Sequence, residues 1–218
     1  FKSKALLFSV IGFPFLSFIT YSGAAFGPAF YMRNFGVSEG EVATVLGLTA
    51  AIAGMTGVIL GGMIGDKLRK KYVNGRFYVA FLVILLIAPF NLGVLYSENL
   101  YASYIWNFIV QLISPMWVGI APAIVADLVM PRMRAIAGAF YILMVSMLGL
   151  ALGPYSVGLL SDTLISQGYS DAEGLKTALA ASMGVLIISA ITLLLACRYL
   201  PGDESSKLDR AKELGEVI

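Results

Sequence analysis

Ionised side chains are scarce in this chain, and histidine is missing altogether. Only 13% of the 218 residues are charged, about half the share that is usual in a soluble domain. Without histidine the chain has no imidazole for a proton relay or a metal site, and its single cysteine, Cys197, cannot form an intrachain disulfide. We therefore expect no cofactor and no metal, and the net charge of +2 gives no reason to expect a nucleic-acid partner.

Long apolar segments fill most of the sequence. Hydrophobic residues make up 59% of the chain, and the mean hydropathy is +0.86. Segments without an ionised residue in their interiors cover approximately 5–32, 42–65, 77–96, 101–126, 135–161 and 175–197. Each has at least about 20 residues, which is enough for a helix to cross roughly 30 Å of hydrocarbon. Because strands of a membrane barrel alternate instead, the pattern predicts an all-α integral membrane protein with six transmembrane helices.

Positive charge lies on one side of these helices. Of the 15 Lys and Arg residues, all but Arg33 and Lys176 fall on the same side. The positive-inside rule then predicts a multi-pass protein with both termini in the cytoplasm, in a bacterial inner membrane. We expect Pro201 to end the last helix and to leave 201–218 as a charged cytoplasmic tail. The chain starts at Phe1 without a methionine, which we interpret as a fragment or a cleaved product.

A short motif recurs in the second and fifth segments. The second ends in Gly62-x-x-x-Asp66 and the fifth in Gly158-x-x-x-Asp162, on opposite sides of the membrane. Each motif closes the second helix of a three-helix group, so the pattern predicts a 3+3 inverted repeat, with chance repetition as the alternative. Capping boxes, Ser38 with Glu41 and Ser170 with Glu173, are expected to open the second and sixth helices.

The stretch from Gly62 to Lys71 combines a glycine-lined helix end, a carboxylate and several cations. A solvated loop would explain the cations but not the Gly-x-x-x-Asp before them. Asp66 could instead cap the N-terminus of another helix, where unpaired N–H groups and the helix dipole favour an anion. Such a contact would hold one face of the protein closed.

These residues resemble the loop signature of the major facilitator superfamily. The matching positions are Gly62, Asp66, Lys67, Lys70 and Lys71, while Arg69 replaces the usual second glycine. The stretch 131–162, with Trp117-Val-Gly-Ile-Ala-Pro122 before it, is most similar to spinster-like members. The resemblance covers residue 1 to about residue 200. It implies the C-terminal six-helix half of a twelve-helix transporter working by alternating access, with the N-terminal half missing from this chain.

A polar stripe on the fourth segment is the main candidate for substrate contact. Tyr104, Asn107, Gln111 and Ser114 share one helical face, and uncharged polar groups in a membrane need either another helix or a wet cavity. In the family, the first and fourth helices of a half line the central cavity, which favours lining over interhelical hydrogen bonding. The residues predicted to line the substrate cavity are Tyr21, Asn107, Gln111, Ser114, Trp117 and Tyr141.

A second set of residues is predicted to form a cytoplasmic gate. Asp127 ends the fourth segment near Arg132 and Arg134, where an ordinary interfacial ion pair is the alternative to a gate. The predicted gate consists of Asp66, Lys67, Arg69, Lys70, Lys71, Asp127 and Arg134.

The predicted cavity is neutral and partly aromatic, which suits an amphiphile. The resemblance to spinster-like proteins agrees, since these are associated with lysophospholipids and sphingolipids, and membrane lipids are the expected surroundings. If transport is proton-coupled, the titrating group should belong to the missing half, because these six segments contain no carboxylate, histidine or arginine. The alternatives are a drug or organic-acid exporter of the same family and a self-sufficient six-helix homodimeric carrier or channel. An enzyme is not expected, because the segments offer no carboxylate or histidine at depth.

Overall fold

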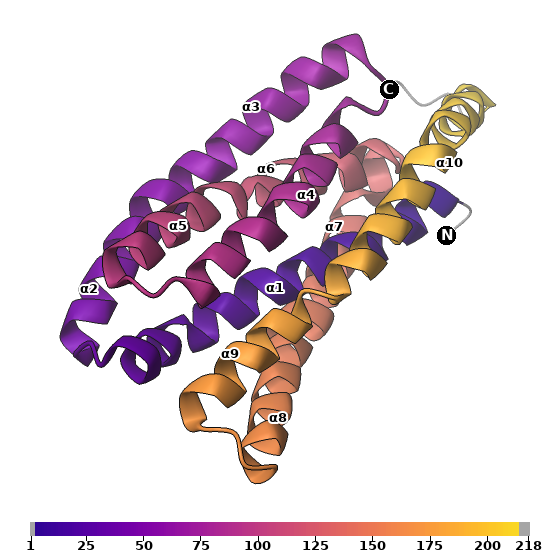
Figure 1. The fold of residues 1–218 in the computed structure, drawn as a ribbon. Coiled ribbons are helices and arrows are strands. Elements are labelled where there is room, and N and C mark those ends of the chain that lie inside the picture. The colour runs from indigo at the N-terminus through magenta and orange to yellow at the C-terminus, as the bar shows by residue number, and fades with distance from the viewer. Residues whose placement is uncertain (1–2, 214–218) are drawn as a thin grey trace.

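Helices occupy almost all of residues 3–213, the part of the chain that the computed structural model describes, with side chains described from 3 to 206 (Figure 1). Within that part, six helical spans are long and apolar enough to cross a membrane: Lys4–Phe35, Glu39–Lys71, Gly75–Tyr96, Leu100–Asp127, Pro131–Ser166 and Asp171–Ser206. Each contains one of the apolar segments expected from the sequence. The predicted all-α fold with six transmembrane helices is therefore confirmed.

Four of the spans are interrupted or locally rewound. The first and third are the single helices α1 (Lys4–Phe35) and α4 (Gly75–Tyr96). The second consists of α2 (Glu39–Thr49), the π-helical η1 (Ala50–Gly54) and α3 (Met55–Lys71). The fourth consists of α5 (Leu100–Ile113) and α6 (Met116–Asp127). The fifth consists of the 3-10 turn η2 (Pro131–Met133), α7 (Arg134–Met144), the π-helical η3 (Val145–Ala151) and α8 (Leu152–Ser166). The sixth consists of α9 (Asp171–Ser182) and α10 (Val185–Glu213).

Both predicted helix starts are capped as expected. The Ser38 hydroxyl accepts a hydrogen bond from the Glu41 N–H at 3.4 Å, and the Ser170 hydroxyl accepts one from the Glu173 N–H at 3.3 Å. At the end of α1 the chain turns on Gly36, whose φ of 67° is the left-handed conformation that favours glycine. These short turns keep successive spans antiparallel.

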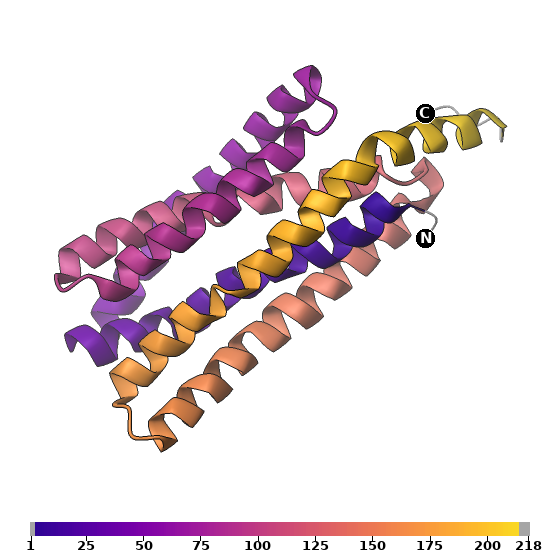
Figure 2. The same ribbon diagram turned by 45° about the vertical axis from the view of Figure 1, so that its right-hand side comes forward.

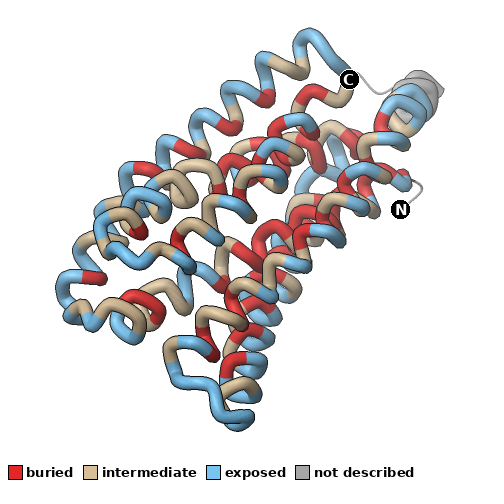
Figure 3. Tube along the Cα trace, viewed as in Figure 1, coloured by how far each residue is buried: buried red, intermediate tan, exposed pale blue. Residues whose placement is uncertain are grey.

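Helices α2–α6 form one group, and α1 with α7–α10 forms the other (Figures 1 and 2). Helix α1 is the most deeply buried span and packs mainly against α10 and η3. In Figure 3 the buried positions concentrate along α1 and its neighbours, whereas α3 is exposed except at points one turn apart. An exposed apolar face of this kind suits lipid or a further set of helices.

The inverted repeat is visible in how the second and fifth spans are built. Each has a π-helical segment near its middle, and in each a buried position recurs every fourth residue. The two buried rows are Ala53, Gly57, Gly61 and Gly65 in one span and Gly149, Gly153, Val157 and Ser161 in the other. Each residue of the buried row in the second span is separated from its counterpart in the fifth span by the same number of positions. The two Gly-x-x-x-Asp motifs are separated by that number as well.

One expectation about the last helix is wrong: α10 continues through Pro201 to Glu213. The Asp203 carboxylate accepts hydrogen bonds from the Ser3 hydroxyl at 2.8 Å and the Ala5 N–H at 2.6 Å, and Glu204 pairs with Arg69. These contacts hold the helical turn that follows the proline against the start of α1 and the end of α3. Of the predicted tail, residues 214–218 lie outside the described part, as do residues 1 and 2 at the other terminus.

Candidate functional site

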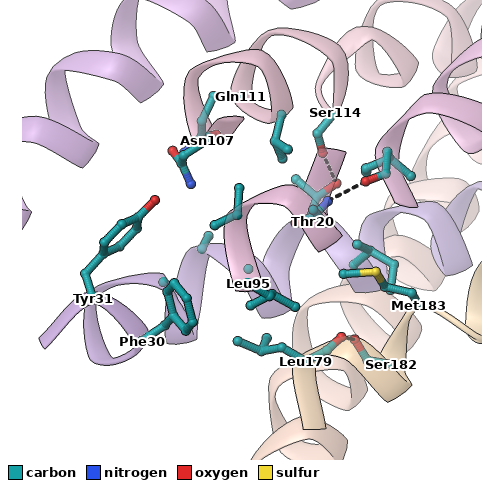
Figure 4. Close-up of a pocket in the computed structure, with 18 residues that line it drawn as sticks. Thr20, Phe30, Tyr31, Leu95, Asn107, Gln111, Ser114, Leu179, Ser182 and Met183 are labelled. Atoms are coloured by element: carbon teal, nitrogen blue, oxygen red, sulfur yellow. Dashed lines mark hydrogen bonds between the residues drawn. The ribbon is translucent and has the colours of Figure 1, made fainter. Parts of the chain in front are cut away.

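A neutral cavity of about 70 Å³ lies between α1, α4, α5 and the junction of α9 with α10 (Figure 4). Most of its wall is apolar, and the aliphatic part includes Ile19, Ile87, Val110 and Leu179. No ionised side chain is among the described residues that line it. Seven side chains with polar groups line it, and these are Thr20, Tyr31, Asn91, Asn107, Gln111, Ser114 and Ser182.

Residues at two helix interruptions line the cavity, Ser114 in the fourth span and Met183 in the sixth. The fourth span breaks at Ser114 and Pro115, near its middle, because proline has no N–H to continue the helix. The sixth span breaks at Met183 and Gly184. Irregular backbone at membrane depth is tolerated where it is covered by protein or lines a cavity, and transporters commonly build binding sites at such breaks.

Hydrogen bonds connect α1 to both sides of the break in the fourth span. The hydroxyls of Thr20 and Ser114 lie 2.8 Å apart (Figure 4). The Trp117 indole N–H donates to the Thr20 hydroxyl at 3.4 Å. Thr20 also donates to the Leu16 carbonyl at 3.4 Å. This link fixes the position of Ser114, so the break has a defined geometry.

One amide oxygen in the cavity wall is able to accept a further hydrogen bond. Asn107 Oδ1 is buried and has no hydrogen-bond partner within the described part of the chain. Beside it, Tyr31 donates to the Ser103 carbonyl at 3.2 Å, and the rings of Tyr31 and Tyr104 lie 4.8 Å apart. Since buried polar atoms are usually paired, Asn107 offers an acceptor for a donor on a bound molecule.

The structure brings together half of the residues predicted for the cavity. Asn107, Gln111 and Ser114 line it, which follows from their shared helical face. Trp117 is buried and contacts the lining residue Thr20. Tyr21 and Tyr141 do not belong to its wall, because Tyr21 lies beside the lining position Thr20 on another face of α1 and Tyr141 is buried on α7.

The predicted cavity set lacked four lining residues with polar groups, Thr20, Tyr31, Asn91 and Ser182. Asn91 carried a usable signal, since an amide within an apolar span is costly without a partner. Its Nδ2 donates to the Ile87 carbonyl at 2.8 Å. Thr20 and Ser182 carried none, because hydroxyls in helices commonly bond to their own backbone, as Ser182 does with the Leu179 carbonyl.

At the end of the bundle where α3 stops and α4 starts, which we call the cationic end, Arg76 connects three helices. Its guanidinium donates to Asp66 Oδ1 at 2.7 and 3.0 Å and also pairs with Asp127. Asp66 lies in the last third of the glycine-lined α3, which continues to Lys71, and Asp127 ends α6. The Arg76 side chain is only 17% exposed, against 61% for Asp66 and 41% for Asp127.

The other residues predicted for the gate surround this cluster in different ways. Arg69 donates to the Val73 carbonyl at 2.9 Å and pairs with Glu204 of α10. Lys71 lies over the Tyr72 ring, and Lys67, Lys70 and Arg134 are exposed. Asp66 therefore meets an arginine of the next helix, and sequence reasoning did not include that arginine in the gate.

The model of the Major Facilitator Superfamily matches residues 7–216, so the chain belongs to this family. An "MFS-type efflux pump" of Mycolicibacterium smegmatis is 27% identical over 198 residues, which cover 91% of this chain and 46% of that protein. The protein spinster of Drosophila melanogaster is 29% identical over 202 residues, covering 88% and 33%. Spinster homolog 1 of Mus musculus is 33% identical over 183 residues, covering 75% and 34%. The predicted likeness to spinster-like members is thus confirmed, and these relatives are transporters.

Solved structures show the same fold. A crystal structure of a bacterial homolog of the human lysosomal transporter spinster, inward-facing and occupied, aligns with a TM-score of 0.79 at 22% identity, covering 93% of this chain and 50% of that one. An inward-facing, unoccupied structure aligns with a TM-score of 0.82, covering 92% and 49%. The chain thus spans about a third to a half of the length of the relatives it matches.

Proposed function

We propose that this chain forms the C-terminal six-helix half of an alternating-access transporter for an amphiphilic, lipid-like substrate such as a lysophospholipid or sphingolipid. The observation that carries the proposal is the neutral cavity at two helix breaks, where amides of α4 and α5 face aliphatic side chains. Such a wall can bond to a few polar atoms while it accommodates apolar groups, which suits an amphiphile better than a sugar or a small anion.

The family and the length of the relatives support the two-half arrangement over a self-sufficient homodimer. The matched relatives are two to three times as long as the aligned part, as a second six-helix unit requires. In this proposal the cationic end faces the cytoplasm, as the positive-inside rule expects, in a bacterial inner membrane. The cluster of Asp66, Arg76 and Asp127 then belongs to the cytoplasmic gate.

Uptake into proteoliposomes tests the proposal directly. The protein from the complete reading frame is reconstituted with labelled lysophospholipid outside, with and without a pH gradient, alongside Gln111→Ala and Asp66→Ala. We expect saturable uptake that Gln111→Ala weakens by about 5- to 10-fold, the cost of one or two hydrogen bonds. Leu85→Ala is the matched control, because Leu85 is 70% exposed on α4 and does not line the cavity.

The outcomes separate the candidate substrates. Uptake that a pH gradient accelerates would place a titrating group outside these six spans. No uptake of lysophospholipid by folded protein would overturn the lipid proposal. A screen of drugs and organic acids would then test the exporter alternative, which the efflux pump of Mycolicibacterium smegmatis favours.

A further inference from the structure

A second, wider hollow lies at the opposite end of the bundle from the cationic end. Its volume is about 420 Å³, and it lies between the end of α1, the end of α4 and the first turns of α9. We call it the outer vestibule, and its lining residues are Phe30, Asn34, Phe35, Leu95, Tyr96, Ser97, Glu98 and Lys176. It shares two lining residues, Phe30 and Leu95, with the neutral cavity.

Two apolar residues belong to the walls of both the vestibule and the cavity. Phe30 and Leu95 line both, and both are buried, with 2% and 6% of their surface exposed. Figure 4 shows them on the same side of the inner cavity. Phe30 and Leu95 therefore offer apolar contact to a molecule in either hollow.

The vestibule carries one charge of each sign beside aromatic rings. Lys176 is one of only two cations in the sequence on this side of the spans, and its Nζ lies 5.3 Å from the centre of the Tyr96 ring. Glu98 follows Tyr96 by two positions and is exposed. A lysine ammonium binds phosphate as a point charge, while an exposed carboxylate attracts an ammonium group.

The uncharged polar groups of the vestibule are already engaged. The Asn34 amide donates to the Phe30 carbonyl at 3.0 Å, and the Ser97 hydroxyl donates to the Asn99 carbonyl at 3.4 Å. A polyhydroxylated head group needs many free hydrogen-bonding partners, and this surface offers mainly the two charges.

We infer that the outer vestibule binds the zwitterionic head group of a single-chain amphiphile, with phosphate at Lys176 and ammonium at Glu98. The chain of the same molecule passes between Phe30 and Leu95 toward the neutral cavity. This inference rests on the proposed transport of an amphiphile and adds a head-group site outside the cavity already described.

Binding to the complete protein in phosphatidylglycerol nanodiscs tests the inference, because that lipid carries no ammonium group to compete. The probes are myristoyl-lysophosphatidylcholine, myristoyl-lysophosphatidic acid, which lacks the ammonium, and tetradecyl maltoside, which is uncharged. Lys176→Gln should weaken both phosphate-bearing probes by about 5-fold, in line with one partly exposed charge contact, and leave the maltoside unchanged. Glu98→Gln should weaken only the choline probe.

Glu39→Gln is the matched control, since Glu39 is an exposed carboxylate at the same end of the bundle and does not line the vestibule. Unchanged affinities in both test variants, equal losses for the maltoside, or no binding of any probe to the wild-type protein would each overturn the inference. The uptake assay separates this from the proposed function. Binding with the expected head-group pattern but without uptake overturns transport alone, and uptake without the pattern overturns the vestibule alone.

Discussion

Single glycines determine how closely the helices approach. A Cβ added to Gly61 would lie 2.2 Å from the Met116 carbonyl oxygen, and one added to Gly57 would lie 2.1 Å from the Leu112 carbonyl oxygen. Both oxygens belong to backbone on either side of the break in the fourth span, so they cannot move away as a side-chain tip could. Helix α3 thus supports the break from the side opposite to the cavity, by direct backbone contact.

Gly61→Ala should destabilise the protein, because α3 must move away from α6 to make room for the methyl group. We expect a loss of about 1–3 kcal/mol in the free energy of unfolding, as for other overpacked sites. Thermal unfolding in detergent, followed by tryptophan fluorescence, measures it. Gly54→Ala is the control in the same span, since its added Cβ would meet nothing within 4 Å. Equal stability of the two variants would contradict the packing argument.

The sequence predicted those lining residues of the cavity that are polar and share one face of a helix. Asn107, Gln111 and Ser114 were accessible to sequence reasoning, because they repeat on one helical face and amides in lipid need a partner. Thr20 and Tyr21 were not separable in the same way. They are neighbours in sequence, and only the direction in which α1 faces its packing partners decides that Thr20 reaches the cavity.

At the scale of elements, the sequence predicted the spans and their starts but not their interruptions. Hydropathy and two serine caps located the helices correctly. Proline did not identify the breaks, since Pro14 and Pro122 lie inside continuous helices, Pro115 lies at a break, and the break at Gly184 involves no proline. Whether a helix continues past a proline depends on the tertiary contacts that satisfy the freed backbone groups.

The extension of α10 past Pro201 depends on its contact with the start of α1. Asp203→Ala removes both hydrogen bonds to Ser3 and Ala5, so the turn after the proline should open more often. Hydrogen exchange followed by mass spectrometry should show backbone amides around residues 201–206 exchanging about 5- to 10-fold faster, as expected for about 1 kcal/mol or slightly more at a helix cap. Ser205→Ala is the control, because that exposed hydroxyl bonds only to its own helix. Unchanged protection in Asp203→Ala would show that the helix needs no such anchor.

At the scale of the whole molecule, the charged cluster at the cationic end belongs entirely to this six-helix unit. Arg76 joins the ends of α3 and α6 to the start of α4, so it makes this end of the unit rigid. Asp66 keeps 61% of its side chain exposed despite the pairing, which leaves carboxylate surface for a contact outside the unit. A rigid end that presents one carboxylate is what rocking of two halves as solid bodies would require.

Arg76→Gln should lower the stability of the cationic end, because it removes the positive charge that pairs with both Asp66 and Asp127. Asp66 and Asp127 would then face each other without a cation, and we expect a loss of about 1–3 kcal/mol in stability together with slower uptake. Adding Asp127→Asn should recover part of that loss, because it removes the remaining repulsion. Lys70→Gln controls for general loss of positive charge, since Lys70 is exposed on the same helix end. The wild type, Arg76→Gln, Asp127→Asn and the double variant form a cycle: recovery by the second substitution supports a cluster acting as one unit. Additive losses would mean that Arg76 contributes packing alone, and the gate would then depend on the exposed cations of 67–71.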